Sequence, residues 1–399
     1  MSTVTAGRRG PDVRSDLWVE LELRDSSGIE HGVKSKVDFM YGAANRSLIL
    51  DLLKTLGVAH ARVAVEDAGA LPFVIAARIE AAVRRARPGK DVPEWLPEPG
   101  PSFAQPSARD RWRRSRLYLP GNEPKFMLSA RLHAPDAVIL DLEDSVPPPD
   151  KDAALLLVRN ALRALDFGGC ERMVRINQSP RGLEEIEPLV RAGANLLLIP
   201  KCEDDDEVEA VAERIDKAGG ETDVRLMPII ETCRGMFKAH KIARASDRVV
   251  ALTWGLEDYI ADLGGTKTAA GFESLWARSQ LVNAARAAGV QAIDTVFGDV
   301  DDLAALAQSC RAARELGFEG KGCIHPRQVA VVNRSFTPAQ DEVERAQRIV
   351  LAFRDAEARG LGVVAVGSKM IDAPVVKRAL RTIELAVACG CLATDWEAK

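Results

Sequence analysis

Carboxylates follow short apolar segments at several places in the chain. The clearest of these acidic residues are Asp141, Glu143, Asp144, Glu231 and Asp258. Oxygen ligands without a nearby histidine or cysteine favour a hard cation, Mg²⁺ or Mn²⁺. The pattern therefore predicts a site for such a cation, on condition that the fold brings these segments together.

Basic side chains occupy the same kind of position. Arg175 lies at the end of one apolar segment, and Lys201 directly follows another. A guanidinium pairs bidentately with a carboxylate, so Arg175 beside a cation suits a small oxo- or hydroxy-acid chelated to Mg²⁺. We interpret Lys201 as an ion-pair partner of the acidic residues rather than as a Schiff-base lysine. The sequence has no Walker loop and no Gly-x-Ser-x-Gly motif, so P-loop nucleotide chemistry and serine hydrolysis have no support.

The elements that must position these residues are eight short apolar segments, separated by helical segments. The apolar segments are 115–120, 137–144, 172–177, 195–200, 225–231, 248–255, 291–296 and 322–326. Short segments rich in Val, Ile and Leu are typical of parallel strands buried on both faces. Eight strand–helix units predict an α/β fold, a (β/α)8 TIM barrel, in which chemistry lies at the carboxyl ends of the strands. A doubly wound open sheet is the alternative.

Proline density divides the chain. Residues 88–110 hold six prolines, a density that no regular element tolerates, and are predicted to be a linker. Residues 1–87 carry alternating strand patterns and two helical patterns, which predict a small α+β domain. The barrel is predicted for residues 111–330. Residues 331–399 contain two strong helical patterns and are predicted to form a C-terminal helical lid or oligomerisation segment.

The composition is that of an ordinary globular chain of 399 residues, 47% hydrophobic and 28% charged. A net charge of −4 gives no electrostatic reason to expect binding to nucleic acid or to an anionic membrane. No apolar run approaches the roughly 20 residues of a membrane span, and the amino terminus lacks a secretory core. The seven scattered cysteines form no CxxC pair, which favours a reducing, cytoplasmic compartment without disulfides.

Nine motifs lie in order along residues 111–385. They are RSRLYLPGNEPKF, AVILDLEDSV, VRIN, LLLIPKCED, PIIETCRG, WGLEDYIADLG, AIDTV, LGFEGKGCIHPRQ and GSKMIDAPVVKRA. This part of the chain resembles the citrate lyase β-subunit-like branch of the HpcH/HpaI aldolase superfamily, which includes malyl-CoA and citramalyl-CoA lyases. The resemblance implies a (β/α)8 barrel enzyme and a homotrimer. It also implies that Mg²⁺ is used to cleave or form the bond between a 2-oxoacid and the enolate of an acyl thioester such as acyl-CoA.

The resemblance also implies roles for individual residues. Glu231 and Asp258 match the metal ligands of the family, and Arg175 matches the arginine that grips the carboxylate of the oxoacid. Asp372, in the motif GSKMIDAP, matches a lid aspartate that handles the proton and that reaches the site across a subunit interface in the family.

Other matched positions have supporting roles. Glu143 and Asp144 match an acidic pair that is expected to hold metal-bound waters or the arginine, and thus to form a wall of the substrate site. The motif LYLPG and the loop after it lie where the family binds CoA. His325 and Asp294 are interpreted as hydrogen-bonded structural residues.

The amino-terminal segments DLWVELELRDSSGIEHGVKSKV and LGVAHARVAVEDAGALPFVIAARIEAAVRRA carry a second resemblance. Over residues 12–87 the chain is similar to the γ subunit of citrate lyase, an acyl carrier protein. The serine that carries the prosthetic group in that family lies two residues before the strand-opening aspartate, here Asp16, and Arg14 occupies that position. Either Ser15, one residue away, is the attachment site, or the domain has lost its cargo and serves as a scaffold, which we favour.

Three functions are therefore considered. The first is a Mg²⁺-dependent carbon–carbon lyase that acts on a β-hydroxyacyl-CoA such as citramalyl-CoA or malyl-CoA. The second is a citryl-carrier lyase that acts on a thioester tethered to its own amino-terminal domain. The third is a non-catalytic carrier or assembly protein. The sequence leaves the acyl group and the direction of the reaction open.

Overall fold

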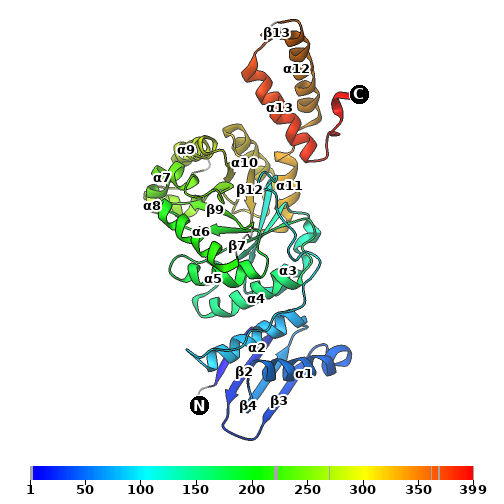
Figure 1. The fold of residues 1–399 in the computed structure, drawn as a ribbon, viewed down its shortest axis with the longest axis vertical. Coiled ribbons are helices and arrows are strands. Elements are labelled where there is room, and N and C mark those ends of the chain that lie inside the picture. The colour runs from blue at the N-terminus through cyan, green and yellow to red at the C-terminus, as the bar shows by residue number, and fades with distance from the viewer. Residues whose placement is uncertain (1–2, 220–222, 269, 361, 367–368, 399) are drawn as a thin grey trace.

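The computed structural model describes residues 3–398 apart from 220–222, 269, 361 and 367–368. Three parts follow one another in chain order along the long axis of the molecule: a small α+β unit, a closed barrel and a pair of long helices (Figure 1). No helix of the described residues is long and apolar enough to cross a membrane. The seven cysteines are all free.

Eight parallel strands close into a barrel, so the predicted barrel is confirmed and the open-sheet alternative is wrong. The strands are β5 (Ser115–Pro120), β6 (Ala137–Asp141), β7 (Glu171–Arg175), β8 (Leu196–Ile199), β9 (Arg225–Ile230), β10 (Ala251–Trp254), β11 (Gln291–Asp294) and β12 (Gly320–Cys323). The last strand pairs with the first, with Gly322 opposite Arg116. Nearly every strand residue is buried, which explains the continuous apolar sequences.

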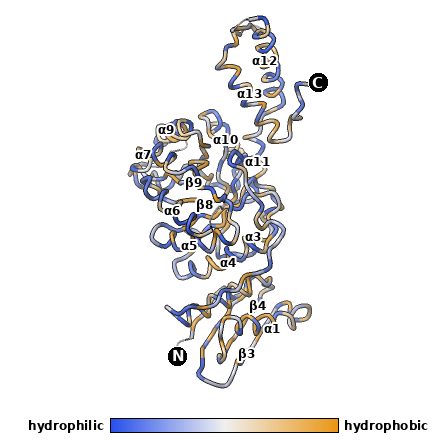
Figure 2. Tube along the Cα trace, in the orientation of Figure 1, coloured by the Kyte–Doolittle hydropathy of each residue, from blue (hydrophilic) through white to orange (hydrophobic). Residues whose placement is uncertain are grey.

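Helices surround the barrel and connect its strands (Figure 1). They are α3 (Pro124–Ser129), α4 (Lys151–Ala164), α5 (Arg181–Arg191), α6 (Asp205–Gly219), α7 (Cys233–Ala243), α8 (Leu256–Leu263), α9 (Phe272–Ala288), α10 (Leu303–Leu316) and α11 (Pro326–Phe336). These helices carry both hydrophobic and hydrophilic residues along their length (Figure 2). The barrel interior is filled by strand side chains, among them Ile139, Met173, Leu198, Met227 and Ile293. Because the interior is packed, a ligand finds room only at an end of the barrel.

The amino-terminal unit is a four-stranded sheet that packs with two helices. The strand order is β1 (Val4–Ala6), β2 (Leu17–Leu23), β4 (Ala61–Asp67) and β3 (Ile29–Ser35), and the helices are α1 (Asp38–Thr55) and α2 (Pro72–Ala86). The predicted α+β class is confirmed. Strand β1 was not predicted, because three residues are too few to show a period.

Helix α2 attaches this unit to the barrel, and it packs against α4. Two buried ion pairs lie at the contact, the first within the amino-terminal unit and the second across to the barrel. Arg78 Nε donates to Asp16 Oδ1 at 2.8 Å, and Arg159 Nη2 of α4 donates to Glu80 Oε2 at 2.6 Å. Arg78 also donates to the carbonyl oxygen of Asn122, in the loop after β5, at 3.0 Å. The Glu80–Arg159 pair and the bond from Arg78 to Asn122 join the two parts. Separation would leave the buried Glu80 without Arg159, so these contacts favour one orientation of the amino-terminal unit.

The proline-rich segment 88–110 contains no helix or strand, and it runs along α4. Arg159 Nη2 donates to the carbonyl oxygen of Trp95 at 3.0 Å, and Arg163 Nε donates to that of Pro97 at 2.6 Å. The segment is thus fastened to the barrel along its length. The domain boundaries given above remain our proposal.

Beyond α11 the chain forms a helical hairpin that projects from the barrel (Figure 1). It consists of α12 (Gln340–Ala358), β13 (Val364–Val366), β14 (Lys369–Ile371) and α13 (Ala373–Ala388). Its helices build a small core of their own, which includes Ile349, Phe353, Val376 and Ile383. The two predicted helices are confirmed, whereas β14 was not predicted. The sequence LGVVAVG (361–367) predicts a short extended run between the helices, and β13 lies within it; positions 361 and 367 lie outside the described residues.

The Asp16–Arg78 pair gives a prediction about stability. Asp16→Asn leaves the 2% exposed Arg78 side chain without a carboxylate, which costs about 3–5 kcal/mol. The expected result is a lower urea midpoint of the first unfolding transition, measured by circular dichroism. Asp38→Asn is the matched control, since the Asp38–Arg46 pair is half-exposed and its loss costs at most about 1 kcal/mol. Equal midpoints for the two variants would contradict the role given to the buried pair.

Candidate functional site

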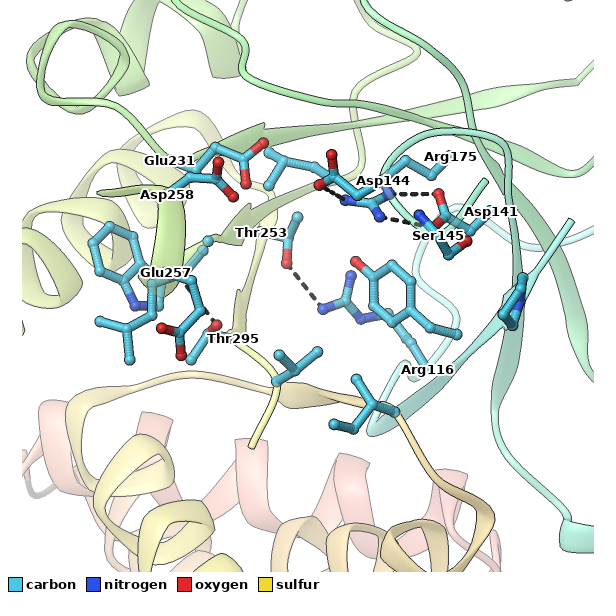
Figure 3. A pocket seen from close by; sticks show the side chains of 18 residues that line it. Arg116, Asp141, Asp144, Ser145, Arg175, Glu231, Thr253, Glu257, Asp258 and Thr295 are labelled. Atoms are coloured by element: carbon cyan, nitrogen blue, oxygen red, sulfur yellow. Dashed lines mark hydrogen bonds and ion pairs between the residues drawn. The ribbon is translucent and has the colours of Figure 1, made fainter. Parts of the chain in front are cut away.

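A cavity of about 420 Å³ opens at the carboxyl ends of the barrel strands (Figure 3). Its lining includes acidic, basic and hydroxyl side chains from separate strands and the loops that follow them. Those used below are Asp141, Arg175, Glu231, Thr253 and Asp258. The structure therefore brings together the acidic and basic residues that the sequence placed after separate apolar segments.

Glu231 directly follows β9 and is 4% exposed. The backbone N–H of Lys201 donates to Glu231 Oε1 at 2.7 Å, and Lys201 has a φ of +46°, in the left-handed region that few residues other than glycine adopt. Burial raises the pKa of Glu231 to about 7; the hydrogen bond from Lys201 opposes this rise, and the negative charges of Asp258 and Glu143 add to it. A cation beside this carboxylate would relieve both the repulsion and the cost of burial.

Asp258 lies in the first turn of α8, close to Glu231. Lys201 Nζ lies 3.1 Å from Asp258 Oδ1, so the interpretation of Lys201 as an ion-pair partner is confirmed. Burial lowers the pKa of the Lys201 ammonium, but the hydrogen bond and the charge of Asp258 outweigh burial, and the net shift is upward. The Asp258 side chain is 40% exposed, which leaves its other oxygen open to the cavity.

Gly255, between β10 and α8, is required by the position of Glu231. A Cβ atom on residue 255 would lie 2.3 Å from Glu231 Oε2, well inside van der Waals contact. The glycine of the motif WGLED therefore makes room for the carboxylate of the preceding strand.

Arg175, at the end of β7, is held by three carboxylates. Its Nε and Nη2 donate to the two oxygens of Asp141 at 2.7 and 2.8 Å. Its Nη1 lies 2.8 Å from Glu143 Oε2 and 3.4 Å from Asp144 Oδ2. Burial lowers the pKa of the Arg175 guanidinium, but the bonds to Asp141 and its charge outweigh burial, so the pKa is raised and the cation is secure. The guanidinium also lies over the Tyr118 ring, 5.4 Å from its centroid.

The two acids predicted to form a wall differ in position. Asp144 lines the cavity and its side chain is 58% exposed. Glu143 is buried behind it, accepts a hydrogen bond from Gln178 Nε2 at 3.2 Å, and does not line the cavity. Burial raises the pKa of Glu143, in spite of the charge of Arg175. Asp141, which was not assigned a role from the sequence, makes the principal contacts with the arginine.

Two predicted site residues, Asp372 and Ser15, lie away from the cavity of their own chain. Asp372 caps the amino end of α13, where its Oδ1 accepts from the backbone N–H of Val375 at 3.3 Å, on the hairpin that projects from the barrel. Ser15 lies in the amino-terminal unit with a φ of +58°, and its N–H donates to the carbonyl oxygen of Ala68 at 2.9 Å. Neither residue lines the cavity.

His325 and Asp294 have the structural roles expected of them. His325 caps α11, and its Nδ1 accepts from the backbone N–H of Arg327 at 3.2 Å. Asp294 is fully buried and accepts from Lys321 Nζ at 2.8 Å and from Arg278 Nη2 at 3.0 Å.

Sequence reasoning assigned no role to Arg116 or Trp254 and named Tyr118 only as part of the motif LYLPG; all three line the cavity. Arg116 sits within a strand, in the motif SRLYLP, and points into the barrel. A basic residue inside a doubly buried strand was the available indication. The indole N–H of Trp254 is buried and has no hydrogen-bond acceptor.

The donors present fit a hard divalent cation. Glu231 and Asp258 offer carboxylate oxygens, and no histidine or cysteine lines the cavity. A second acidic group, Asp204, Asp205 and Asp206, lies outside the cavity. It is less suitable, because Lys238, Lys241 and Arg234 pair with it.

Comparison with known proteins agrees with this architecture. The family model HpcH/HpaI aldolase/citrate lyase matches residues 114–326, and the model malonate decarboxylase delta subunit, an acyl carrier family, matches residues 8–86. Citrate lyase subunit beta of Leuconostoc mesenteroides subsp. cremoris is 36% identical over 69% of this chain and 94% of its own. Mitochondrial citramalyl-CoA lyase of Homo sapiens is 32% identical over 69% of this chain and 85% of its own.

A solved structure gives the same result. CitE from Mycobacterium tuberculosis, in complex with magnesium, acetoacetate and coenzyme A, matches with a TM-score of 0.59 and 31% identity. The match covers 70% of this chain and 99% of the other. Both resemblances drawn from the motifs are thereby confirmed at the level of the family. The chain belongs to the HpcH/HpaI aldolase/citrate lyase family of lyases and carries an acyl-carrier-like domain in front of its barrel.

Proposed function

We propose that the protein is a Mg²⁺-dependent carbon–carbon lyase. It would cleave or form a β-hydroxyacyl-CoA, such as citramalyl-CoA or malyl-CoA, with a 2-oxoacid and an acyl-CoA on the other side of the reaction. The observation that carries the proposal is the meeting of Arg175, Glu231 and Asp258 in one cavity at the carboxyl ends of the strands. The magnesium and coenzyme A in the related CitE structure support the choice of cation and thioester.

In this proposal Glu231 and Asp258 hold the cation. When bound, the cation supplies positive charge beside the substrate hydroxyl oxygen and the oxoacid carbonyl that forms from it. Gly255 keeps the Glu231 carboxylate in place, because any side chain there would push it away. Lys201 is paired with Asp258. When the cation binds, the Lys201 ammonium would either move away or remain bound to the Asp258 oxygen that does not face the cation.

Arg175 would bind the carboxylate of the oxoacid. Of its three acidic partners, Asp144 is the most exposed and makes the longest contact, 3.4 Å. Asp144 is therefore the partner that a substrate carboxylate would replace at Nη1. Asp141 would remain bound to Nε and Nη2 and keep the guanidinium plane oriented.

Cleavage requires two proton movements. A general base takes the proton of the substrate hydroxyl, and the oxygen forms the carbonyl of the oxoacid. The electrons of the breaking carbon–carbon bond pass to the acyl Cα, which becomes the carbon of an enolate. A general acid then protonates that carbon. Asp372 lies on the projecting hairpin, away from the cavity of its own chain, so we propose that it serves the site of a neighbouring subunit in a trimer.

A citryl-carrier lyase with a self-tethered substrate is the second candidate. It is favoured by the contact of the carrier-like domain with the loop after β5, where Arg78 donates to the Asn122 carbonyl oxygen at 3.0 Å. It is disfavoured by Arg14 at the attachment position. Intact-mass spectrometry of the native protein decides between the two, since a tethered substrate requires a prosthetic-group adduct on Ser15.

The proposed function is tested with a panel of malyl-, citramalyl- and related hydroxyacyl-CoA thioesters, with and without EDTA. Thioester loss and oxoacid release are measured together. Turnover that stops with EDTA and returns with Mg²⁺ is the expected result. If the metal-loaded protein turns over none of them, the non-catalytic alternative is favoured.

Removal of a proposed ligand should weaken metal binding strongly. Glu231→Gln is expected to weaken Mg²⁺ or Mn²⁺ binding beyond the roughly 10- to 100-fold loss typical of outer-sphere partners, since it removes a charged ligand. Isothermal titration calorimetry measures the affinity. Asp262→Asn is the matched control, because Asp262 lies in the same helix as Asp258 but accepts from the backbone N–H of Cys233 and does not line the cavity. The proposal fails at this point if both variants bind the cation as the unchanged protein does.

The raised pKa of Glu231 gives a pH dependence. Binding needs the carboxylate form, and the pKa is about 7, so affinity should fall as pH drops through neutrality. The expected Mg²⁺ affinity is about tenfold weaker at pH 6 than at pH 8. Proton release on binding, measured in two buffers of different ionisation enthalpy, should accompany it at the lower pH. An affinity that is flat across this range would contradict the assignment of Glu231.

A further inference from the structure

We propose that Arg116 recognises a second carboxylate on the oxoacid part of the substrate, so that the enzyme prefers a 2-oxo-dicarboxylate such as oxaloacetate to a monocarboxylate. The inference rests on the proposed function and adds a specificity-determining residue to it. Arg116 lies on β5, at the floor of the cavity, and its guanidinium points toward Thr253 (Figure 3).

Arg116 is buried without a carboxylate partner among the described residues, although its side chain is only 1% exposed. Its Nη2 donates to Thr253 Oγ1 at 2.9 Å and, more weakly, to the carbonyl oxygen of Asp294 at 3.4 Å. Its Nη1 lies 3.0 Å from Met227 Sδ, a weak acceptor. Its Nε has no acceptor. A buried cation with these neutral partners keeps most of its desolvation cost.

Other buried arginines are treated differently. Arg78, Arg113 and Arg159 are each about as buried, and each forms an ion pair with a buried carboxylate. Arg172, near the opposite end of the barrel, resembles Arg116 in lacking one, but it donates to the Asn195 side chain and the Gln105 backbone. Arg116 is thus the unpaired guanidinium of the cavity where we place the substrate.

The one carboxylate close to Arg116 is already neutralised. Asp294 is bound by both Lys321 and Arg278. Lys321, Arg278 and Arg116 are therefore three cations around one anion, Asp294. The net charge of this group is positive. Burial lowers the pKa of the Arg116 guanidinium, as expected for a cation without a counter-ion. A ligand carboxylate would supply the missing charge and acceptors for Nε and Nη1.

The position indicates which part of the substrate is recognised. CoA is too large to enter a cavity of about 420 Å³ and must lie at its mouth. The oxoacid carboxylate would be held by Arg175 and its reacting carbon by the cation site, at the rim. The floor is then left for the end of the oxoacid farthest from CoA, and a carboxylate at that end would meet Arg116.

The experiment measures binding of oxaloacetate and pyruvate, each with Mg²⁺, to the unchanged protein, Arg116→Met, Arg116→Lys and Arg172→Met. The expected result is a preference for oxaloacetate in the unchanged protein. In Arg116→Met, oxaloacetate affinity falls about 10- to 100-fold, as expected for lost charge-assisted hydrogen bonds, and pyruvate affinity is retained. Arg116→Lys restores part of the preference, and Arg172→Met leaves it unchanged.

A thermal melt separates this role from a structural one. If Arg116 serves a ligand, Arg116→Met keeps or raises the melting temperature without ligand, because an uncompensated buried charge is replaced by an apolar chain of similar length. The proposal is overturned if the unchanged protein binds both acids equally, or if Arg116→Met lowers the melting temperature and both affinities together. If the unchanged protein binds neither acid and cleaves no thioester, the proposed function itself fails and this inference with it.

Discussion

The parallel pairing of β12 with β5 is the interaction on which the cavity depends. It closes the sheet and places the carboxyl ends of all eight strands on one rim. In an open sheet with the same strands, β5 and β12 would be opposite edges. Arg116 and Tyr118 of β5 would then be separated from Ile324, which follows β12 and now lines the same cavity. Closure therefore converts charged residues that are far apart in the sequence into one concave site.

The two arginines of the cavity carry opposite electrostatic surroundings. Arg175 has more carboxylates than it can neutralise, and Arg116 has none. Glu231 and Asp258 line the same cavity, and the charge of Asp258 contributes to the raised pKa of Glu231. Each of these unbalanced charges, taken alone, lowers the stability of the folded protein. Together they make the cavity complementary to a divalent cation and an anionic ligand, which is the usual trade of stability for function at a site.

The sequence predicted much of this structure, and the failures have physical causes. The strands of the barrel were visible because burial on both faces demands continuous apolar residues. The acids at strand ends were visible because the middle of a buried strand rarely tolerates charge. The same rule should have identified Arg116, but one basic residue in a strand gives no partner by spacing. The partner of Arg175 was equally hidden: Asp141 faces it across neighbouring strands, a relation that only the register of the sheet defines. Strands β1 and β14 escaped notice because three residues show no period.

The attachment of the amino-terminal unit bears on our proposal that it is a scaffold rather than a mobile carrier. A carrier delivers its thioester by moving between sites, which requires a weak or polar attachment to its partners. Here α2 is buried against α4, and separation would break the buried ion pair between Glu80 of α2 and Arg159 of α4. Asp16 precedes the strand close to the expected attachment position. Both of its carboxylate oxygens accept hydrogen bonds from Arg78. Arg78 in turn bonds the loop after β5, which borders the cavity-lining Pro120. The unit is therefore better suited to brace this rim of the barrel than to carry cargo to it, and the proposed substrate is a free CoA thioester for the same reason.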